Sequence, residues 1–223
     1  MVETLADELN VLHTRLLGAT CGRISTMFHG PPIDDEAILE RLPGPYAELL
    51  RSVNGYVAYH GGLHVRGACH QPTWHSLRYN WLGDGAIHKL YPTLTPDDIP
   101  FAEDALGDQF IVRGGKRGGI VHRLSAETGE LTSLGVDLPD FDAKVQADPV
   151  EFLQLHPLLQ IRSEGRDLEP GQLLSVIPPF VLKCDGERSF KPVDGRQHLE
   201  WLAGFARQIR DLPDGGQVQL KWV

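Results

Sequence analysis

Four histidines and one cysteine lie within a short stretch of the sequence and are the first candidates for chemistry. Imidazole nitrogens and thiolates bind zinc well, so they raise the hypothesis of a metal-dependent hydrolase. Their spacing does not support it, because two adjacent glycines interrupt the helix that would place the first two histidines on one face. We therefore favour structural roles and expect no metal site at His60, His64, His70, His75 and Cys69.

A glycine-rich stretch with basic residues, 113–119, is a second candidate, for phosphate binding. Glycines let backbone N–H groups approach an anion, and Lys116 and Arg117 add positive charge. The stretch lacks the GxxxxGK[ST] order and leads into an apolar strand, which favours a hairpin loop. No GxSxG motif is present, and the cysteines lack the local signatures of cysteine proteases. We expect no enzymatic activity, catalytic residue or cofactor.

Five acidic residues fall in residues 90–112, which contain no Lys or Arg: Asp97, Asp98, Glu103, Asp104 and Asp108. Aspartates beside proline and glycine suit tight turns. Carboxylates on loops of a sheet also make a negative surface that steers a cationic protein. Both interpretations can hold together. We therefore expect these acids to contribute to a partner-binding surface, with aromatic anchors drawn from Trp74, Tyr79 and Trp81.

The overall charge agrees with a basic partner. The chain has 223 residues and a formal net charge of −9, and residues 1–112 hold 7 basic and 14 acidic side chains. Nucleic acids and anionic membranes are bound by clustered Lys and Arg, so this composition argues against both partners. No signal peptide or spanning segment is recognised, and three widely spaced cysteines predict reduced thiols. We therefore expect a cytoplasmic protein.

The positions of apolar residues predict helices first and a sheet afterwards. Leu5, Leu9, Leu12 and Leu16 predict an amphipathic helix over 3–17, and helical spacing continues in 34–42 and 46–53. From residue 56 the period changes towards two. We expect strands at 56–59, 63–65, 99–101, 109–113, 118–124 and 130–134, a loop with helical turns over 72–91, and a helix from 148 to 161.

The last part of the chain reads as a small extension. Residues 163–172 are polar, contain Gly and Pro, and are predicted to be a linker after a domain at 1–162. Strands at 173–184 and 187–191, a helix over 199–209 and a strand at 217–223 predict a ββαβ unit spanning 173–223. So short a unit buries little apolar surface alone, and we expect it to dock on the first part.

Two segments resemble the SMI1/KNR4 (SUKH) superfamily. Residues 42–55 match its "LP-x-x-Y…LL…NG" signature, and residues 99–110 are similar to its "IPFA-x-D-x-x-GD-x-F/Y" strand and turn. A TGE-type hairpin at 127–130 and an apolar pair at 152–153 follow in the family's order, so that the resemblance covers residues 1–160. The matching positions are Leu42, Pro43, Tyr46, Asn54, Gly55, Asp104, Gly107 and Asp108, and we expect most of them to determine the fold.

The resemblance implies an α+β fold, with a twisted, mostly antiparallel sheet flanked by helices, and the element order above agrees. It implies a non-enzymatic protein-binding module, either an immunity protein that neutralises a cognate bacterial toxin, such as a nuclease, or a regulatory scaffold. The segment 113–119 and the extension 173–223 depart from the family pattern and leave the binding face open. The hydrolase hypothesis stays as a third alternative.

Overall fold

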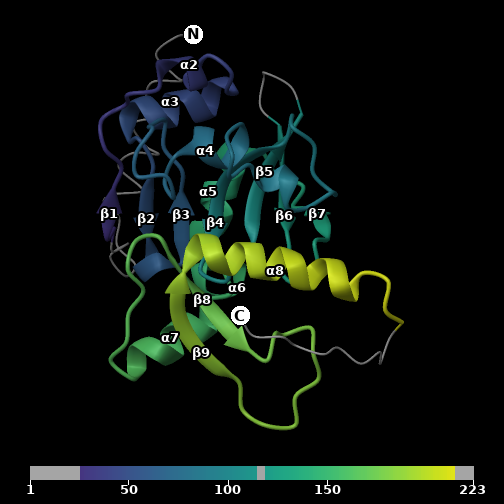
Figure 1. The fold of residues 1–223 in the computed structure, drawn as a ribbon. Coiled ribbons are helices and arrows are strands. Elements are labelled where there is room, and N and C mark those ends of the chain that lie inside the picture. Colours follow the sequence, from purple (N-terminus) through teal and green to yellow (C-terminus); the bar gives the residue numbers. More distant parts are fainter. Residues whose placement is uncertain (1–25, 115–118, 214–223) are drawn as a thin grey trace.

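The computed structural model describes residues 26–114 and 119–213, and Figure 1 shows their fold. The helix expected over 3–17, the strand expected at 217–223 and the centre of the glycine-rich stretch lie outside the described residues. The fold is α+β, as expected: a sheet flanked by helices, with a small two-stranded unit beside it.

The main sheet has seven strands in the order β1-β2-β3-β4-β5-β6-β7, and each pairs antiparallel with its neighbour. Sequential strands are thus spatial neighbours, and the sheet is an antiparallel meander. The strands are β1 (Phe28–His29), β2 (Tyr56–Ala58), β3 (Leu63–Val65), β4 (Ile99–Asp104), β5 (Gln109–Arg113), β6 (Ile120–Leu124) and β7 (Leu131–Ser133).

Alternating side chains of β5 enter two different cores. Phe110 packs with Phe141 of α5 (Leu138–Ala147) in the larger cluster, whereas Ile111 packs in a second cluster with Leu202 of α8 (Gly195–Ile209). Successive side chains of a strand point to opposite faces, so the sheet is covered on both sides. Figure 1 shows α8 crossing one face of the strands and α5 lying behind them.

The helices before and within the sheet are short. They are α2 (Glu36–Leu39), α3 (Gly44–Ser52), α4 (Leu77–Trp81) and the 3₁₀ turns at Tyr59–Gly61 and Ile87–Lys89. Asp35 accepts a hydrogen bond from the Ile38 amide and thereby caps the start of α2. Helices α2 and α3 correspond to the two helices expected over 34–42 and 46–53. Helix α4 and the 3₁₀ turn at Ile87–Lys89 are the helical turns expected between 72 and 91.

The helix expected from 148 to 161 is divided in two. The structure has α6 (Pro149–Phe152), capped by Asp148, and α7 (His156–Ser163). Gln154 between them has a φ of 53°, which a continuous right-handed helix does not allow. Helix α5 was not expected, although Asp137 caps it as Asp148 caps α6.

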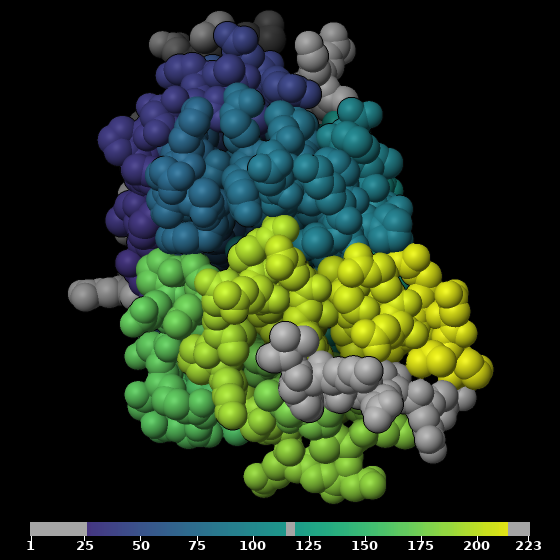
Figure 2. Space-filling view, viewed as in Figure 1, coloured from purple at the N-terminus to yellow at the C-terminus, as the bar shows by residue number. Residues whose placement is uncertain are grey.

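The C-terminal unit consists of β8 (Gln172–Ile177), β9 (Ser189–Asp194) and α8, and it docks on the main sheet. The Leu174 amide donates to the Ala105 carbonyl at 2.7 Å, so β8 is joined to the turn after β4. Figure 2 shows this unit, in green and yellow, seated against one end of the sheet region. Strand β8 ends at Ile177, so the strand expected over 173–184 is shorter than expected.

The segment expected as a linker is packed rather than free. Leu168 is 1% exposed within the larger core, and Gly171, at a φ of 88°, lies against the Trp74 ring. A Cβ on Gly171 would come within 3.1 Å of that ring, whereas a Cβ on Gly165, also at positive φ, would meet no atom within 4 Å.

We predict that Gly171→Ala destabilises the protein more than Gly165→Ala does. Both substitutions carry the strain of positive φ, about 1 kcal/mol, but only the first also crowds Trp74, which adds about 1–3 kcal/mol. Chemical denaturation of the two variants measures the difference. Equal losses would show that the contact between Gly171 and Trp74 does not hold the extension in place.

Candidate functional site

The structure corrects the expected acidic surface over residues 90–112. Of the five acids, only Asp97 has an exposed side chain, whereas Asp98 is 4% and Asp104 is 1% exposed. The Glu103 side chain is 14% exposed and Asp108 is partly buried. These four acids are engaged by groups of the protein itself, so they do not form a continuous negative surface.

Two of the buried acids are neutralised by arginines. Asp98 receives two hydrogen bonds from Arg113, at 2.6 and 2.7 Å. Burial alone would raise the pKa of Asp98, but the bonds from Arg113 and Thr95 hold it below its usual range. Arg113 belongs to the stretch considered for phosphate binding, and this ion pair occupies its guanidinium group.

The second arginine, Arg66, is 1% exposed and lies at the centre of a buried network. Its guanidinium donates to Glu103 at 2.6 Å, to Gln109 at 2.8 Å and to the Pro100 carbonyl at 2.8 Å. The pairing of β4 with β5 shifts register between Pro100 and Ala102, which leaves carbonyls for Arg66 to bind. Burial opposes ionisation of Glu103, yet Arg66 and His64 lower its pKa to about 2.

Two histidines extend this network in a chain. His64 Nδ1 lies 2.9 Å from Glu103, His64 Nε2 lies 2.9 Å from His75 Nδ1, and His75 Nε2 lies 3.0 Å from the Asn54 carbonyl. The carboxylate and the carbonyl only accept, so filling all three contacts needs one proton more than two neutral imidazoles carry. Burial lowers the pKa of both rings, that of His75 to about 4.

The other histidines of the original cluster lie apart. His70 is exposed and contacts Asp34 at 3.3 Å, and His60 sits in the 3₁₀ turn after β2 at a φ of 59°. Burial raises the pKa of the Cys69 thiol to about 11, which makes it a poor metal ligand at neutral pH. Within the described part of the chain, no three His, Cys, Asp or Glu residues are placed to hold a metal ion.

The three aromatic candidates contact other parts of the same chain. Trp81 is 5% exposed and donates to the Pro96 carbonyl at 2.8 Å. Trp74 packs on His64, His75 and Phe28. Arg196 of α8 lies over the Tyr79 ring at 5.7 Å. Tyr79 therefore contacts α8, the Trp74 ring lies against Gly171 just before β8, and Trp81 is a core residue.

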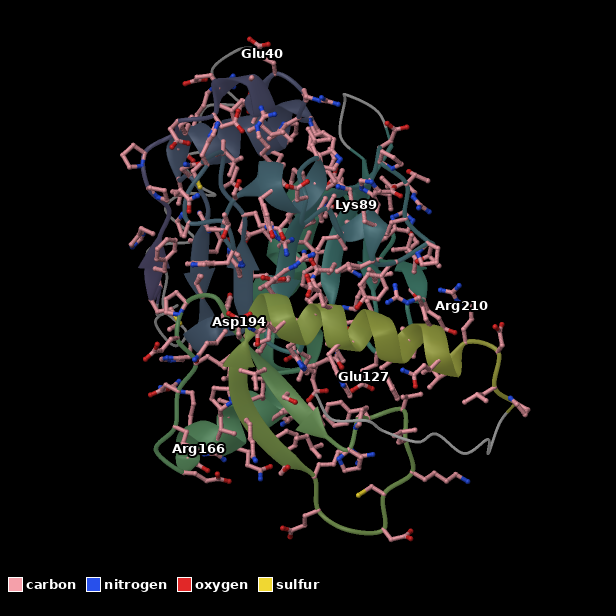
Figure 3. The ribbon with its side chains drawn as sticks, in the orientation of Figure 1. Glu40, Lys89, Glu127, Arg166, Asp194 and Arg210 are labelled. Carbon is pink, nitrogen blue, oxygen red and sulfur yellow. The ribbon has the colours of Figure 1, made fainter. Side chains whose placement is uncertain are left out.

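A cavity of about 130 Å³ lies where the hairpin turns of the sheet meet β8 and α8. Asp108, Glu127 and His198 are its ionisable lining residues, and Figure 3 shows Glu127 beside α8. Its other lining residues are Leu106, Ser125, Gln154, Leu174, Val176, Phe180 and Leu202. Of these three residues only Asp108 was expected at a binding site. Glu127 was noted only as part of the hairpin at 127–130, and His198 reaches the cavity because the C-terminal unit docks on the sheet.

Burial shifts all three ionisable groups of the cavity towards their neutral forms. It raises the pKa of Asp108 and of Glu127, and it lowers the pKa of His198 to about 4. Asp104, next to Asp108 in space, has a pKa well above its usual range because of burial and the charge of Asp108. Perturbed ionisable groups that line a concavity are a physical mark of a candidate binding site.

Comparison with known proteins adds a likeness of fold. No protein-family model and no curated protein matches this chain. The crystal structure of Atu4351 from Agrobacterium tumefaciens is similar to it, with a TM-score of 0.50 and 17% sequence identity over 80% of this chain and 85% of that one. At this identity the similarity concerns the arrangement of helices and strands alone. No helix among the described residues is long and apolar enough to cross a membrane.

We predict that Glu103→Gln lowers the free energy of unfolding by about 3–5 kcal/mol, because it leaves the buried Arg66 charge without its partner. The matched change Asp97→Asn removes the same charge from an exposed side chain of the same acidic run, and we expect less than about 0.5 kcal/mol. Urea unfolding measures both. A small effect of Glu103→Gln would contradict the central role given to this ion pair.

We predict that His198 makes the protein sensitive to mild acid. Its pKa is about 4 in the folded chain and about 6.5 when unfolded, so the unfolded state binds the proton first. The contribution of neutral His198 to the free energy of unfolding is therefore fully present above pH 6.5, and it is lost as the pH falls towards 4. His198→Gln removes this loss, so its stability relative to the native chain should rise by about 3 kcal/mol across that range. A constant difference in urea unfolding would contradict the prediction.

Proposed function

We propose that this protein is a non-enzymatic protein-binding module, most consistent with an immunity protein that neutralises a cognate toxin. The feature that supports this most is the loop between β8 and β9, which presents two adjacent apolar side chains to solvent. Phe180 is 43% and Val181 is 46% exposed. Exposed apolar residues on an ordered loop suit the anchoring role that a few side chains play in protein interfaces.

The loop between β8 and β9 is fixed by contacts with Glu127 and Arg188. The Glu127 carboxylate accepts the amides of Phe180 and Val181 at 2.9 and 3.0 Å. Arg188 lies over the Phe180 ring at 5.3 Å and donates to the Leu182 carbonyl at 2.8 Å. A loop that is already ordered loses less conformational entropy when a partner binds, which favours affinity.

The net negative charge of the chain supports a basic partner, although four of the five acids in residues 90–112 are buried or partly buried. Asp35, Asp98 and Glu103 are matched one to one by Arg78, Arg113 and Arg66. These pairs cancel, so the whole formal excess of −9 remains with the other residues. Such a field would speed encounter with a cationic protein such as a nuclease toxin.

A regulatory scaffold is the second candidate, since an apolar loop and a net negative charge serve any basic protein partner equally. Co-expression with a toxin encoded beside this protein separates the two functions. An immunity protein restores growth and forms a stable complex with the toxin. Failure to restore growth, together with stable partners in a pull-down from the native host, would favour the scaffold.

We predict that the double change Phe180→Ser and Val181→Ser weakens toxin binding by about thirtyfold or more, the loss of one strong anchor. Leu159→Ser is the matched control, because Leu159 is 45% exposed on α7 and lies outside the loop. Calorimetric titration measures both, and thermal unfolding checks that each variant folds. Equal affinities for both variants would rule out the loop as the contact surface.

A further inference from the structure

His198 is the unusual member of the cavity described above. It is 8% exposed and lines the cavity, and its ring stacks on Trp201 of the same helix. Within residues 26–114 and 119–213, its ring nitrogens have no hydrogen-bond partner. A polar group that is nearly buried gains from a hydrogen-bond partner, so an imidazole that lines a cavity can bind a donor placed in that cavity.

The two carboxylates of the cavity each keep room for a further donor. Glu127 accepts the Phe180 amide on one oxygen and the Val181 amide on the other. Asp108 accepts the Ala126 amide at 2.8 Å and the Gln154 side chain at 3.2 Å. A carboxylate has about four lone-pair sites, so about two remain on each group after these bonds.

Among the residues that the structure describes, no cation lines the cavity. Its ten lining residues include neither Lys nor Arg. Of the nearest arginines, Arg123 is held over Phe110 and Phe152 and donates to the Phe152 carbonyl, whereas Arg188 is held over Phe180. Against the burial that raises the pKa of Asp108 and of Glu127, the charges of Arg123 and Arg188 act to lower it, but both carboxylates accept their hydrogen bonds from backbone amides and Gln154.

We propose that this cavity binds a primary ammonium group carried on a short aliphatic chain. The N–H donors of the ammonium meet the free acceptor sites of Glu127, Asp108 and the neutral imidazole of His198. The aliphatic chain packs on the apolar part of the lining, which Leu106, Leu174, Val176 and Leu202 supply. The cavity volume of about 130 Å³ suits a small group of this kind rather than a folded peptide.

The chemistry of the lining excludes the alternatives of similar size. An anion would face two carboxylates, with no Lys or Arg among the lining residues to bind it. A neutral alcohol has a single O–H donor, so it would leave the other acceptor atoms of Glu127, Asp108 and His198 without a hydrogen bond. The same ammonium group is carried by a free amine and by a lysine side chain of a partner, and the experiment distinguishes these two sources.

The test is a titration of the full chain with n-butylammonium, 1-butanol and butyrate, followed by NMR of the histidine ring protons. We expect saturable binding of n-butylammonium that shifts the His198 signal, identified by its loss in His198→Leu. Butanol and butyrate should bind at least about tenfold more weakly, the value of one charge-assisted hydrogen bond. Absence of saturable binding, or equal binding of butyrate or butanol, would overturn the proposal.

Variants then locate the site. Glu127→Gln should weaken n-butylammonium binding about tenfold, and Glu130→Gln, which removes the same charge from an exposed position three residues later, should leave it unchanged. Since Glu127→Gln could also loosen the loop, His198→Leu gives a second measurement that leaves the Glu127 contacts in place. If neither Glu127→Gln nor His198→Leu weakens binding, the ligand sits elsewhere and the proposal fails.

A final arm identifies the source of the ammonium group. The tripeptide Gly-Lys-Gly replaces n-butylammonium in the same titration. Binding of both, with the same sensitivity to His198→Leu, supports a site that a partner's lysine can enter. Binding of n-butylammonium alone supports a site for a free amine. The result is separate from toxin neutralisation, since it is measured without any protein partner.

Discussion

A single buried charge organises the middle of the sheet. Arg66 follows β3, and its guanidinium bonds to strand β4 on both sides of the register shift and to Glu103. Pro100 has no N–H to give to the ladder, so the irregular pairing there is covered by a side chain instead. The Tyr46 hydroxyl donates to the Arg66 carbonyl at 2.8 Å, which fixes α3 to the same point. Helix, strands and histidine chain therefore share one electrostatic centre.

Much of the fold could be predicted from local patterns, and the use of the acidic residues could not. Alternation in β5 and β6 and the Asp148 cap indicate elements that the structure contains. Whether a carboxylate is exposed or buried depends on whether an arginine lies close enough in the fold to pair with it. Asp98 finds Arg113, and Glu103 finds Arg66 across 37 positions of sequence. A count of charges along the chain contains no information on such pairings.

The division of the expected closing helix and the origin of the cavity were both beyond local pattern. The apolar spacing of 149–161 continues through Gln154, although the backbone reverses hand at that residue. Glu127 lies in the hairpin at 127–130 and His198 in the distant helix α8, and only the docking of α8 brings them to one cavity. Asp104 is 1% exposed and accepts the amides of Leu106 and Asp108 in the turn after β4, a role that depends on backbone geometry rather than on charge.

The two-sided covering of the sheet has a consequence for synthesis on the ribosome. The face around Ile111 and Leu124 is completed by α8, whose residues are translated long after β5 and β6. Until then the nascent sheet carries an uncovered apolar surface, and domains of this kind begin folding from the N-terminal side during translation. The protein therefore passes through an interval in which a chaperone, or another unfinished copy, can bind where its own last helix belongs.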